Sequence, residues 1–385
     1  MGASAVTASL FTACGLNEKQ IRRIARKTKF SERASGKINV PRLLECVCEE
    51  VVKGTVSYND LAATMQVATG YLVSRQAYWE RMNTDACLAF FKAILATVML
   101  RKLNLLKVTP LTKCALYKRI LVQDSTVIQL PARLFAIFSG VRNAHTTACN
   151  ARIQGVYDLC SGQFISFSID PYSKNDFSAA REIEAQPGDL ILRDRGYFLI
   201  EVIETFKNKG IDTINRYKHG TTLYDSETSK EINLIELLSL KGTVDMMVLA
   251  GKKKNIKVRL LAIPAAEEVA NLRRMKAKKE TNGHAPSQEL LWLMSWSIFI
   301  VTIETPAITI NHIVALYGLR WRIENIFKTW KSNFSFDKLH NVSEKQLHVL
   351  LTARLIVITL SYQGAFAPLC CEVRRSVSVR LKSPT

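Results

Sequence analysis

The cysteines and histidines of this sequence are not spaced as they are in metal sites or disulfide frameworks. Its nine cysteines include no C-x-x-C pair, and its six histidines are dispersed along the 385 residues. Zinc sites made of cysteine and histidine need short, repeated spacings between their ligands. We therefore expect no metal site of this kind, and reduced thiols in the core of a cytoplasmic protein.

Long uninterrupted hydrophobic runs are also missing. The apolar stretches 86–99 and 347–361 are broken by Lys92 and Arg354, whereas a membrane-spanning helix needs roughly 18 or more apolar residues in succession. The N-terminal segment lacks the basic region of a signal peptide. The sequence predicts no membrane segment and no targeting segment.

Acidic residues are scarce relative to basic ones. There are 33 Asp and Glu residues against 53 Lys and Arg residues, which gives a net charge of +20 and an isoelectric point near 9.6. Such an excess favours a polyanionic partner, nucleic acid before a membrane surface. The hydrophobic fraction of 48% is sufficient for real cores, and the length is typical of two or three domains.

Hydrophobic periodicity divides the chain into helical and strand-rich parts. Helical periods give way near residue 119 to the strand patterns RILVQD, ARIQGVYDL, QFISFSID and DLILRD, with helical patterns at 176–184 and 197–208. We expect an α/β fold in five segments: a helical domain (1–118), the first part of a mixed-sheet core (119–210), a β-rich insertion (211–306), a helix that completes the core (307–342), and a C-terminal helix with an irregular basic tail (343–385).

Two short helices around a glycine are predicted within 57–82. Ser74 is placed to cap the second helix, which carries Arg75, Gln76 and Arg81. A helix-turn-helix presents such a second helix to the major groove of DNA. Ordinary packing of two helices fits the same pattern, so both interpretations stay open.

The stretch YGLRWRIENIFKTWK, residues 317–331, predicts one amphipathic helix that begins near Thr309. Four polar side chains fall within about 60° of one another on this helix: Tyr317, Arg320, Glu324 and Lys331. Their stripe borders a broad apolar face, where a carboxylate loses hydration unless a cation offsets the loss. Glu324 is therefore a candidate site residue, although a surface ion pair between Arg320 and Glu324 fits the spacing equally well.

Two of the expected strands end in aspartate, Asp124 in ILVQDST and Asp194 in LILRDRGYF. Neighbouring strands would bring both carboxylates to one sheet edge, and a helix packed across the sheet would bring Glu324 to them. Three oxygen ligands suit Mg²⁺ or Mn²⁺, and two such ions about 4 Å apart promote phosphoryl transfer. Because some acidic triple can always be chosen from 33 residues, the hypothesis depends on the strand ends and the polar stripe.

The four stripe residues match the pattern Y-x2-R-x3-E-x6-K. Together with QDST and DRGY, this pattern resembles the bacterial DDE transposases of insertion-sequence family four, over most of the chain. The resemblance implies a ribonuclease-H-like catalytic core and an inserted β-domain, and we expect the helical N-terminal domain (1–118) to bind DNA. It also implies cut-and-paste DNA transposition through strand hydrolysis, hairpin formation and strand transfer.

The resemblance implies roles for individual residues. Asp124, Asp194 and Glu324 would be catalytic and would bind two Mg²⁺ or Mn²⁺ ions. DNA phosphates would be held by the other three stripe residues, Tyr317, Arg320 and Lys331. Further basic candidates for DNA binding are Arg75, Lys252, Lys253 and Lys254. A flipped base would stack on Trp292 or Trp296, for which burial in the core is the alternative interpretation.

The implied partners are double-stranded DNA, as terminal inverted repeats and as target, and a second copy of the chain in a synaptic homodimer. The implied location is the bacterial cytoplasm, in association with the nucleoid. The tail beyond the helix that begins near Ser343 departs from the family's pattern. Two alternatives therefore stay open: a transposase-derived DNA-binding protein with impaired catalysis, and a structure-selective nuclease of the same fold.

Overall fold

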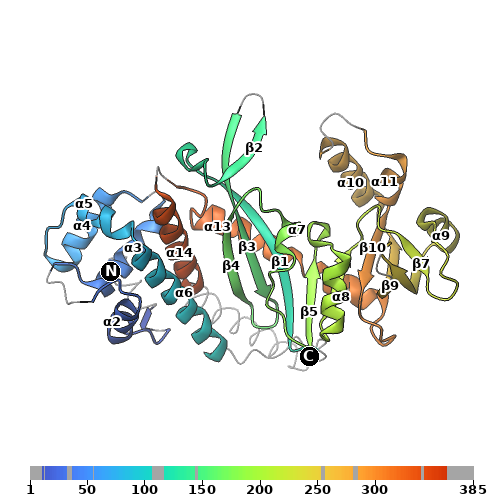
Figure 1. The fold of residues 1–385 in the computed structure, drawn as a ribbon, viewed down its shortest axis with the longest axis horizontal. Helices are drawn as coiled ribbons and strands as arrows, with labels where there is room; N and C mark the ends of the chain where they lie inside the picture. The colour runs from blue at the N-terminus through green and yellow to red at the C-terminus, as the bar shows by residue number, and fades with distance from the viewer. Residues whose placement is uncertain are drawn as a thin grey trace, which may run out of the picture.

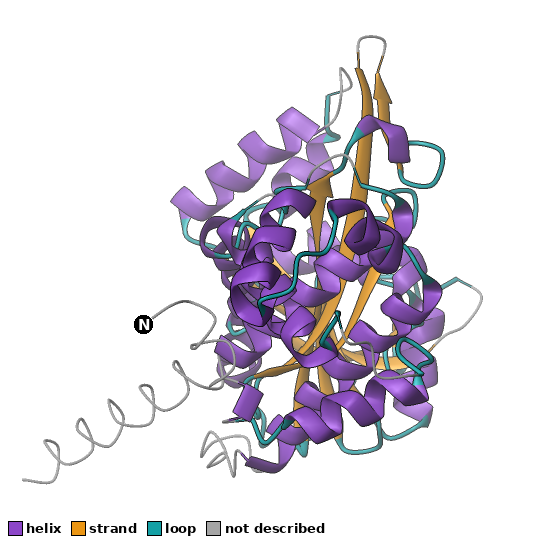
Figure 2. Cartoon of the chain, turned by 90° about the vertical axis from the view of Figure 1, so that its left-hand side faces the viewer, coloured by secondary structure: helices purple, strands orange, loops and turns teal. Residues whose placement is uncertain are grey.

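The computed structural model describes residues 11–12, 14–32, 37–54, 56–105, 117–143, 146–252, 256–280, 285–339 and 342–361. The N-terminal helices gather at one end of the molecule, and a mixed sheet extends from there to the opposite end (Figure 1). Seen from the helical end, helices lie in front of the strands (Figure 2). The hydrophobic core is continuous between these helices and the first strands of the sheet.

The described part of the N-terminal helical unit includes the helices α2 (Glu18–Lys27), α3 (Val40–Lys53), α4 (Tyr58–Thr69), α5 (Arg75–Met82) and α6 (Asp85–Leu105). Four of them begin after a capping residue whose side chain accepts a backbone N–H: Asn17, Asn39, Ser57 and Ser74. Such caps satisfy donors that the first helical turn leaves unpaired. Gly70, with a left-handed φ of 74°, ends α4. The predicted helix, glycine and helix over 57–82 are confirmed.

The last described helix, α14 (Glu344–Ser361), packs against α6 and α3. Most of its side chains are buried, and Arg354 is only 1% exposed. The Arg354 guanidinium donates hydrogen bonds to four backbone carbonyls, those of Val51, Gly54, Phe336 and Lys338. The C-terminal helix thus completes the N-terminal helical unit.

The core sheet is built from five strands: β1 (Arg119–Gln129), β3 (Thr146–Asp158), β4 (Gln163–Pro171), β5 (Asp189–Arg193) and β6 (Asp212–Arg216). Their spatial order is β4-β3-β1-β5-β6, in which β3 is antiparallel to β4 and β1, and β1, β5 and β6 are parallel. The strand β2 (Ser139–Asn143) pairs with the start of β3, and this hairpin extends beyond the rest of the sheet (Figure 1). The expected α/β class with a ribonuclease-H-like mixed sheet is confirmed.

Two helices connect the parallel strands of this core. The helix α7 (Asp176–Ala179) precedes β5, and α8 (Ile200–Asn208) lies between β5 and β6. The helix expected over 176–184 is therefore shorter than predicted. Beyond Ala179 the chain is no longer helical and leads to the buried strand β5. The apolar residue Ile183 of this segment still packs against residues of the core strands.

Residues 211–306 begin with the core strand β6 and then contain more strands, as expected: β7 (Leu223–Asp225), β8 (Val244–Ala250), β9 (Ile256–Pro264) and β10 (Trp296–Val301), with the helices α9 (Leu234–Lys241), α10 (Glu267–Glu280) and α11 (Gln288–Leu293). These strands surround a separate apolar cluster. The strand β10 pairs with β6, with Phe299 opposite Arg216. The insertion therefore continues the sheet of the core in the order β6-β10-β9-β8-β7.

The stretch predicted as one helix from Thr309 forms two, α12 (Ile310–Gly318) and α13 (Trp321–Asn333). At the junction, Leu319 and Arg320 donate their N–H groups to carbonyls three residues earlier. These tight i to i−3 bonds interrupt the α-helical ladder, and hydrophobic periodicity does not reveal such a change. The apolar face of α13 is buried as predicted, with Ile323, Phe327 and Trp330 in the core.

No single helix among the described residues is both long and apolar enough to span a membrane. The helices Arg75–Met82 and Asp85–Leu100 reach that length and hydrophobicity only when they are taken together, and the chain bends by 72° between them. Six cysteines lie in the described ranges, and all six are free thiols. Five of them are buried, as expected for reduced core residues.

Candidate active site

Asp124 lies in β1, at the end of the part of this strand that pairs with β5. The sequence suggested that the strand ends there, but β1 continues to Gln129 because its second half pairs with the long strand β3. The Asp124 side chain is 16% exposed. Burial raises its pKa to about 7, against the charge of Arg320 and a hydrogen bond from the Ser125 backbone, which both lower it.

Asp194 follows β5 directly and precedes a 3-10 turn, η2 (Arg195–Tyr197). The parallel register of β1 and β5 aligns Gln123 with Arg193, so the next residues on the two strands are the two aspartates. The Tyr317 hydroxyl, from the last turn of α12, donates to Asp194 Oδ1 at 3.3 Å. Burial, followed by the charge of Asp194, raises the pKa of Tyr317, which therefore stays a hydrogen-bond donor.

Glu324 lies in the first turn of α13 and faces the sheet. Arg320 Nη2 donates to Glu324 Oε1 at 2.5 Å, and Arg320 Nη1 lies 3.6 Å from Asp124 Oδ2. The arginine and glutamate side chains are only 15% and 28% exposed. The i,i+4 ion pair thus forms, but it lies against β1 and includes an aspartate from the sheet, unlike a solvated surface pair.

The negative charges of all three carboxylates stabilise the protonated guanidinium of Arg320. Burial lowers the pKa of Arg320, but the charges of Tyr317, Asp194, Asp124 and Glu324 outweigh burial and raise it. The structure therefore brings together the three predicted catalytic residues with Tyr317 and Arg320. Lys331 makes its contact further along β1, where its Nζ donates to the Val127 carbonyl at 2.8 Å, and burial lowers its pKa.

The donor set suits a divalent cation of the Mg²⁺ type, because Asp124, Asp194 and Glu324 offer carboxylate oxygens only. Within the described ranges, no three His, Cys, Asp or Glu side chains lie close enough together to bind a metal ion as they are arranged in this structure. In this arrangement Arg320 supplies the positive charge among the carboxylates. Three carboxylates around the Arg320 guanidinium carry an excess of negative charge, which favours the binding of a cation.

The other predicted residues lie elsewhere. Arg75 is exposed at the start of α5, and Lys252 is exposed after β8. Lys253 and Lys254 lie outside the described residues. Trp292 and Trp296 are partly buried in the insertion, where their rings lie 5.8 Å apart and pack on its apolar cluster.

The sequence interpretation missed several residues around the carboxylates. The pKa of the half-buried Arg216 is lowered to about 10, first by its partial burial and then by the charges of Arg273 and Arg195. Arg216 lies over the Phe299 ring, and Arg273 reaches from α10 to the Trp296 carbonyl. Trp321, next to Arg320, is 54% exposed. Only Arg195, in the DRGY segment, and Trp321, in the stretch 317–331, had a signal in the sequence.

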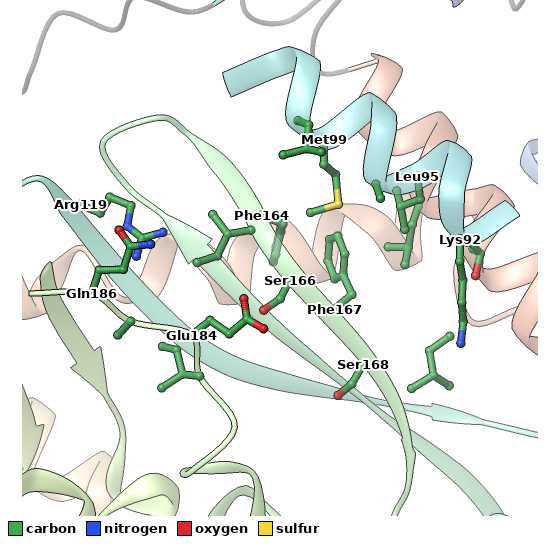
Figure 3. Close-up of a pocket in the computed structure, with 18 of the residues that line it drawn as sticks. Lys92, Leu95, Met99, Arg119, Phe164, Ser166, Phe167, Ser168, Glu184 and Gln186 are labelled. Atoms are coloured by element: carbon green, nitrogen blue, oxygen red, sulfur yellow. The ribbon is translucent and has the colours of Figure 1, made fainter. Parts of the chain in front are cut away.

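A cavity of about 1100 Å³ lies between α6, α14 and the strand β4 (Figure 3). Leu95 and Met99 line it from α6, and Phe164 and Phe167 line it from β4. None of the three carboxylates borders it. This cavity is therefore separate from the candidate site that the three carboxylates form.

A ribonuclease-H-like sheet with two aspartates at the ends of paired parallel strand segments, and a glutamate from a later helix, defines the DDE class of enzymes. The sequence profile described as "Transposase DDE domain" matches residues 117–360, and the chain belongs to this family. It is a DDE transposase of the bacterial insertion-sequence type, as the sequence predicted.

Proteins of similar sequence are also described as transposases. The chain is 28% identical over 329 residues to the transposase for insertion sequence element IS231E of Bacillus thuringiensis subsp. finitimus, covering 80% of this chain and 68% of the relative. It is 27% identical over 369 residues to the transposase for IS1151 of Clostridium perfringens, covering 89% and 77%. A piggyBac transposase synaptic complex with hairpin DNA aligns at 10% identity over 100% of this chain and 83% of that chain, with a TM-score of 0.45, too low to bear on the fold.

Proposed function

We propose that this transposase cleaves DNA at the ends of an insertion sequence and joins the freed 3′ ends to target DNA, in a cut-and-paste reaction with a hairpin intermediate. The observation that carries the proposal is the cluster at the sheet edge, where Arg320 contacts Asp124 and Glu324 and the neighbouring Tyr317 donates a hydrogen bond to Asp194. A phosphodiester brought to this edge would meet carboxylates and arginine together, as phosphoryl transfer requires.

Asp124, Asp194 and Glu324 would hold divalent cations, Mg²⁺ or Mn²⁺ and two in number in this proposal. When bound, such ions activate the attacking oxygen and stabilise the leaving oxygen. Arg320 would exchange carboxylate contacts for a bidentate contact with a DNA phosphate, which its planar guanidinium suits. The Tyr317 hydroxyl would donate a hydrogen bond to the same backbone, and Lys331 would supply a point charge further along β1.

DNA binding would extend over other basic parts of the chain. Arg75 on exposed α5 would contact an element end, while Lys252 to Lys254 would contact flanking DNA. The cluster of Arg195, Arg216 and Arg273 beside Asp194 supports a DNA path from the core toward the insertion. The proposal also includes terminal inverted repeats as substrates, a synaptic homodimer and activity at the bacterial nucleoid. Light scattering of the chain with end DNA tests the homodimer.

The test uses duplexes that carry the inverted repeats flanking the gene. Alanine at Asp124, Asp194 or Glu324 should abolish Mg²⁺-dependent cleavage and leave mobility-shift binding of end DNA largely intact. Asp170→Ala is the matched control, because Asp170 lies on β4, pairs with Lys174 and is not one of the three carboxylates. Cleavage that survives all three single changes would contradict the proposed site.

The same assays separate the two alternatives left open by the sequence. A protein that binds ends and never cleaves them, with Mg²⁺ or with Mn²⁺, is a DNA-binding derivative. Cleavage that depends on branched or hairpin structure and ignores the repeat sequence indicates a nuclease. Joining of a cleaved repeat end to unrelated target DNA supports the transposase.

A further inference from the structure

A fourth carboxylate, Asp176, lies behind the active site and is not part of the three-carboxylate motif. It occupies the first turn of α7, which begins after the capping residue Asn175. Its Oδ1 accepts three hydrogen bonds, from Ser125 Oγ at 2.8 Å, Arg152 Nη1 at 3.1 Å and Gln154 Nε2 at 3.1 Å. Arg152 also donates to Ser125 Oγ at 3.1 Å, so the four side chains form one network.

This network is attached to both segments that carry the catalytic aspartates. Ser125 immediately follows Asp124 on β1. Gly196 comes two residues after Asp194, and a Cβ atom placed on it would lie 3.0 Å from Asp176 Oδ2. The buried Tyr197 hydroxyl donates to Gln154 Oε1 at 2.7 Å. Asp176 is thus held between the segment after Asp124 and the turn after Asp194.

We propose that Asp176 is a positioning residue that fixes the spacing of Asp124 and Asp194 through Ser125 and the Gly196 turn. The inference rests on the proposed function, because the spacing matters only if both aspartates act on one phosphodiester. The pairing of β1 and β5 fixes the two backbones as far as Gln123 and Arg193, but each aspartate lies one residue beyond this paired segment, so its position also depends on what holds the residues that follow it. Asp176 is a single side chain that contacts both segments.

The contacts of Asp176 distinguish positioning from direct metal binding. Its Oδ1 already has three donors, one of them the charged Arg152, and its Oδ2 faces the Gly196 backbone at close range. Arg152 is itself fixed by its position over the Tyr172 ring, 4.8 Å from the centroid. A carboxylate used in this way orients its neighbours, as outer-shell partners of metal ligands do.

The first test compares Asp176→Ala with Asp176→Asn. Alanine removes the acceptor, so single-turnover cleavage of end DNA should fall roughly 10- to 100-fold, as for loss of outer-shell partners. The dissociation constant for end DNA should change less than about twofold, because no DNA contact is removed. Asparagine keeps an oxygen acceptor for Ser125 and should recover most of the rate. Asp170→Ala, the matched aspartate on β4, should cleave like the wild type.

Gly196→Ala probes the same contact without deleting any polar group. Its backbone φ is compatible with alanine, but the new methyl group would press on the Asp176 carboxylate. We expect the same selective loss of cleavage with unchanged end binding. This variant and Asp176→Asn keep the inference testable even if Asp176→Ala fails to fold.

A readout without DNA completes the test. Calorimetric titration with Mn²⁺ alone should show roughly tenfold weaker binding to Asp176→Ala and Gly196→Ala than to Asp170→Ala. The inference is overturned if both variants cleave and bind Mn²⁺ like the control, or if cleavage is lost only in proportion to unfolding. If Asp124→Ala still cleaves DNA, the proposed function fails instead, and the two failures are distinguishable.

Discussion

At the scale of single residues, Arg320 is the clearest test of how this site recognises DNA. It contacts Glu324 and Asp124 and carries the charge that the three carboxylates share. We expect Arg320→Lys to bind end DNA nearly normally, because the charge remains, and to cleave at least about tenfold more slowly, because the planar fork is lost. Single-turnover cleavage and mobility shifts measure the two effects.

Arg181→Lys is the matched control, since Arg181 pairs with Glu201 while both side chains are more than half exposed. An exposed pair of this kind contributes little, so this variant should behave like the wild type. Normal cleavage by both Arg320→Lys and Arg320→Ala would show that Arg320 only stabilises the fold.

Asp124 predicts a pH dependence of stability in the absence of divalent cations. Burial raises its pKa from 3.8 to about 7, so between these values the folded state holds a proton that the unfolded chain releases. The free energy of unfolding therefore falls as the pH rises through this window. Asp124→Asn removes this loss, and we expect it to be more stable than the wild type by about 1–4 kcal/mol at pH 8.

The measurement is urea unfolding in the presence of a chelator, at several pH values. Near pH 4 the two proteins should be equally stable, because the wild-type carboxyl is then neutral in the folded state. A stability difference that is the same at pH 4 and pH 8 would show that the substitution acts through packing and not through the charge.

At the scale of elements, α14 connects the helical unit to the end of α13 through one side chain. Arg354 donates to carbonyls at the end of α3 and in the segment after α13. We expect Arg354→Leu to lower the free energy of unfolding by about 3–5 kcal/mol, because several buried carbonyls lose their donors together. Lys345→Leu on the exposed side of α14 is the control, and chemical denaturation is the measurement. Equal stability of the two variants would contradict this role.

Elements with a strong hydrophobic pattern could be predicted from the sequence, and their contacts with other elements could not. The apolar face of α13 and the strand β5 follow from local periodicity. The break at Leu319 and Arg320 does not, because it consists of two backbone hydrogen bonds to carbonyls three residues earlier, which leave no mark in the hydrophobic pattern. The extension of β1 past Asp124 depends on pairing with β3, a partner that local sequence does not show.

The candidate site also combines residues that local sequence predicts with residues whose role depends on contacts between elements. Asp124, Asp194 and Glu324 were found because they stand beside apolar patterns and match a motif. Asp176 was missed because it lies in a four-residue helix among polar neighbours and acquires its role only when α7 packs beside β1 and β3. Arg216 and Arg273 were missed because the sheet, and not the sequence, brings the insertion beside the core.

At the scale of the whole molecule, the net charge of +20 predicts binding to any duplex DNA with strong salt dependence. If six to ten phosphates are neutralised, affinity should fall roughly 10³- to 10⁵-fold between about 50 and 200 mM salt. Fluorescence anisotropy with an unrelated duplex gives the slope. Arg75→Ala should reduce the slope by about one if Arg75 contacts a phosphate, and Glu80→Ala on the same helix should not.

Because α14 completes the helical unit, this unit depends on a segment that the ribosome makes late. The helices α3 and α6 emerge early, but the helix that covers them follows roughly 250 residues later, about 10–50 s at ordinary rates of synthesis. Until then, their apolar surface has no native cover. A nascent chain therefore cannot complete its N-terminal unit until Asp124, Asp194 and Glu324, the proposed catalytic residues, have all been synthesised.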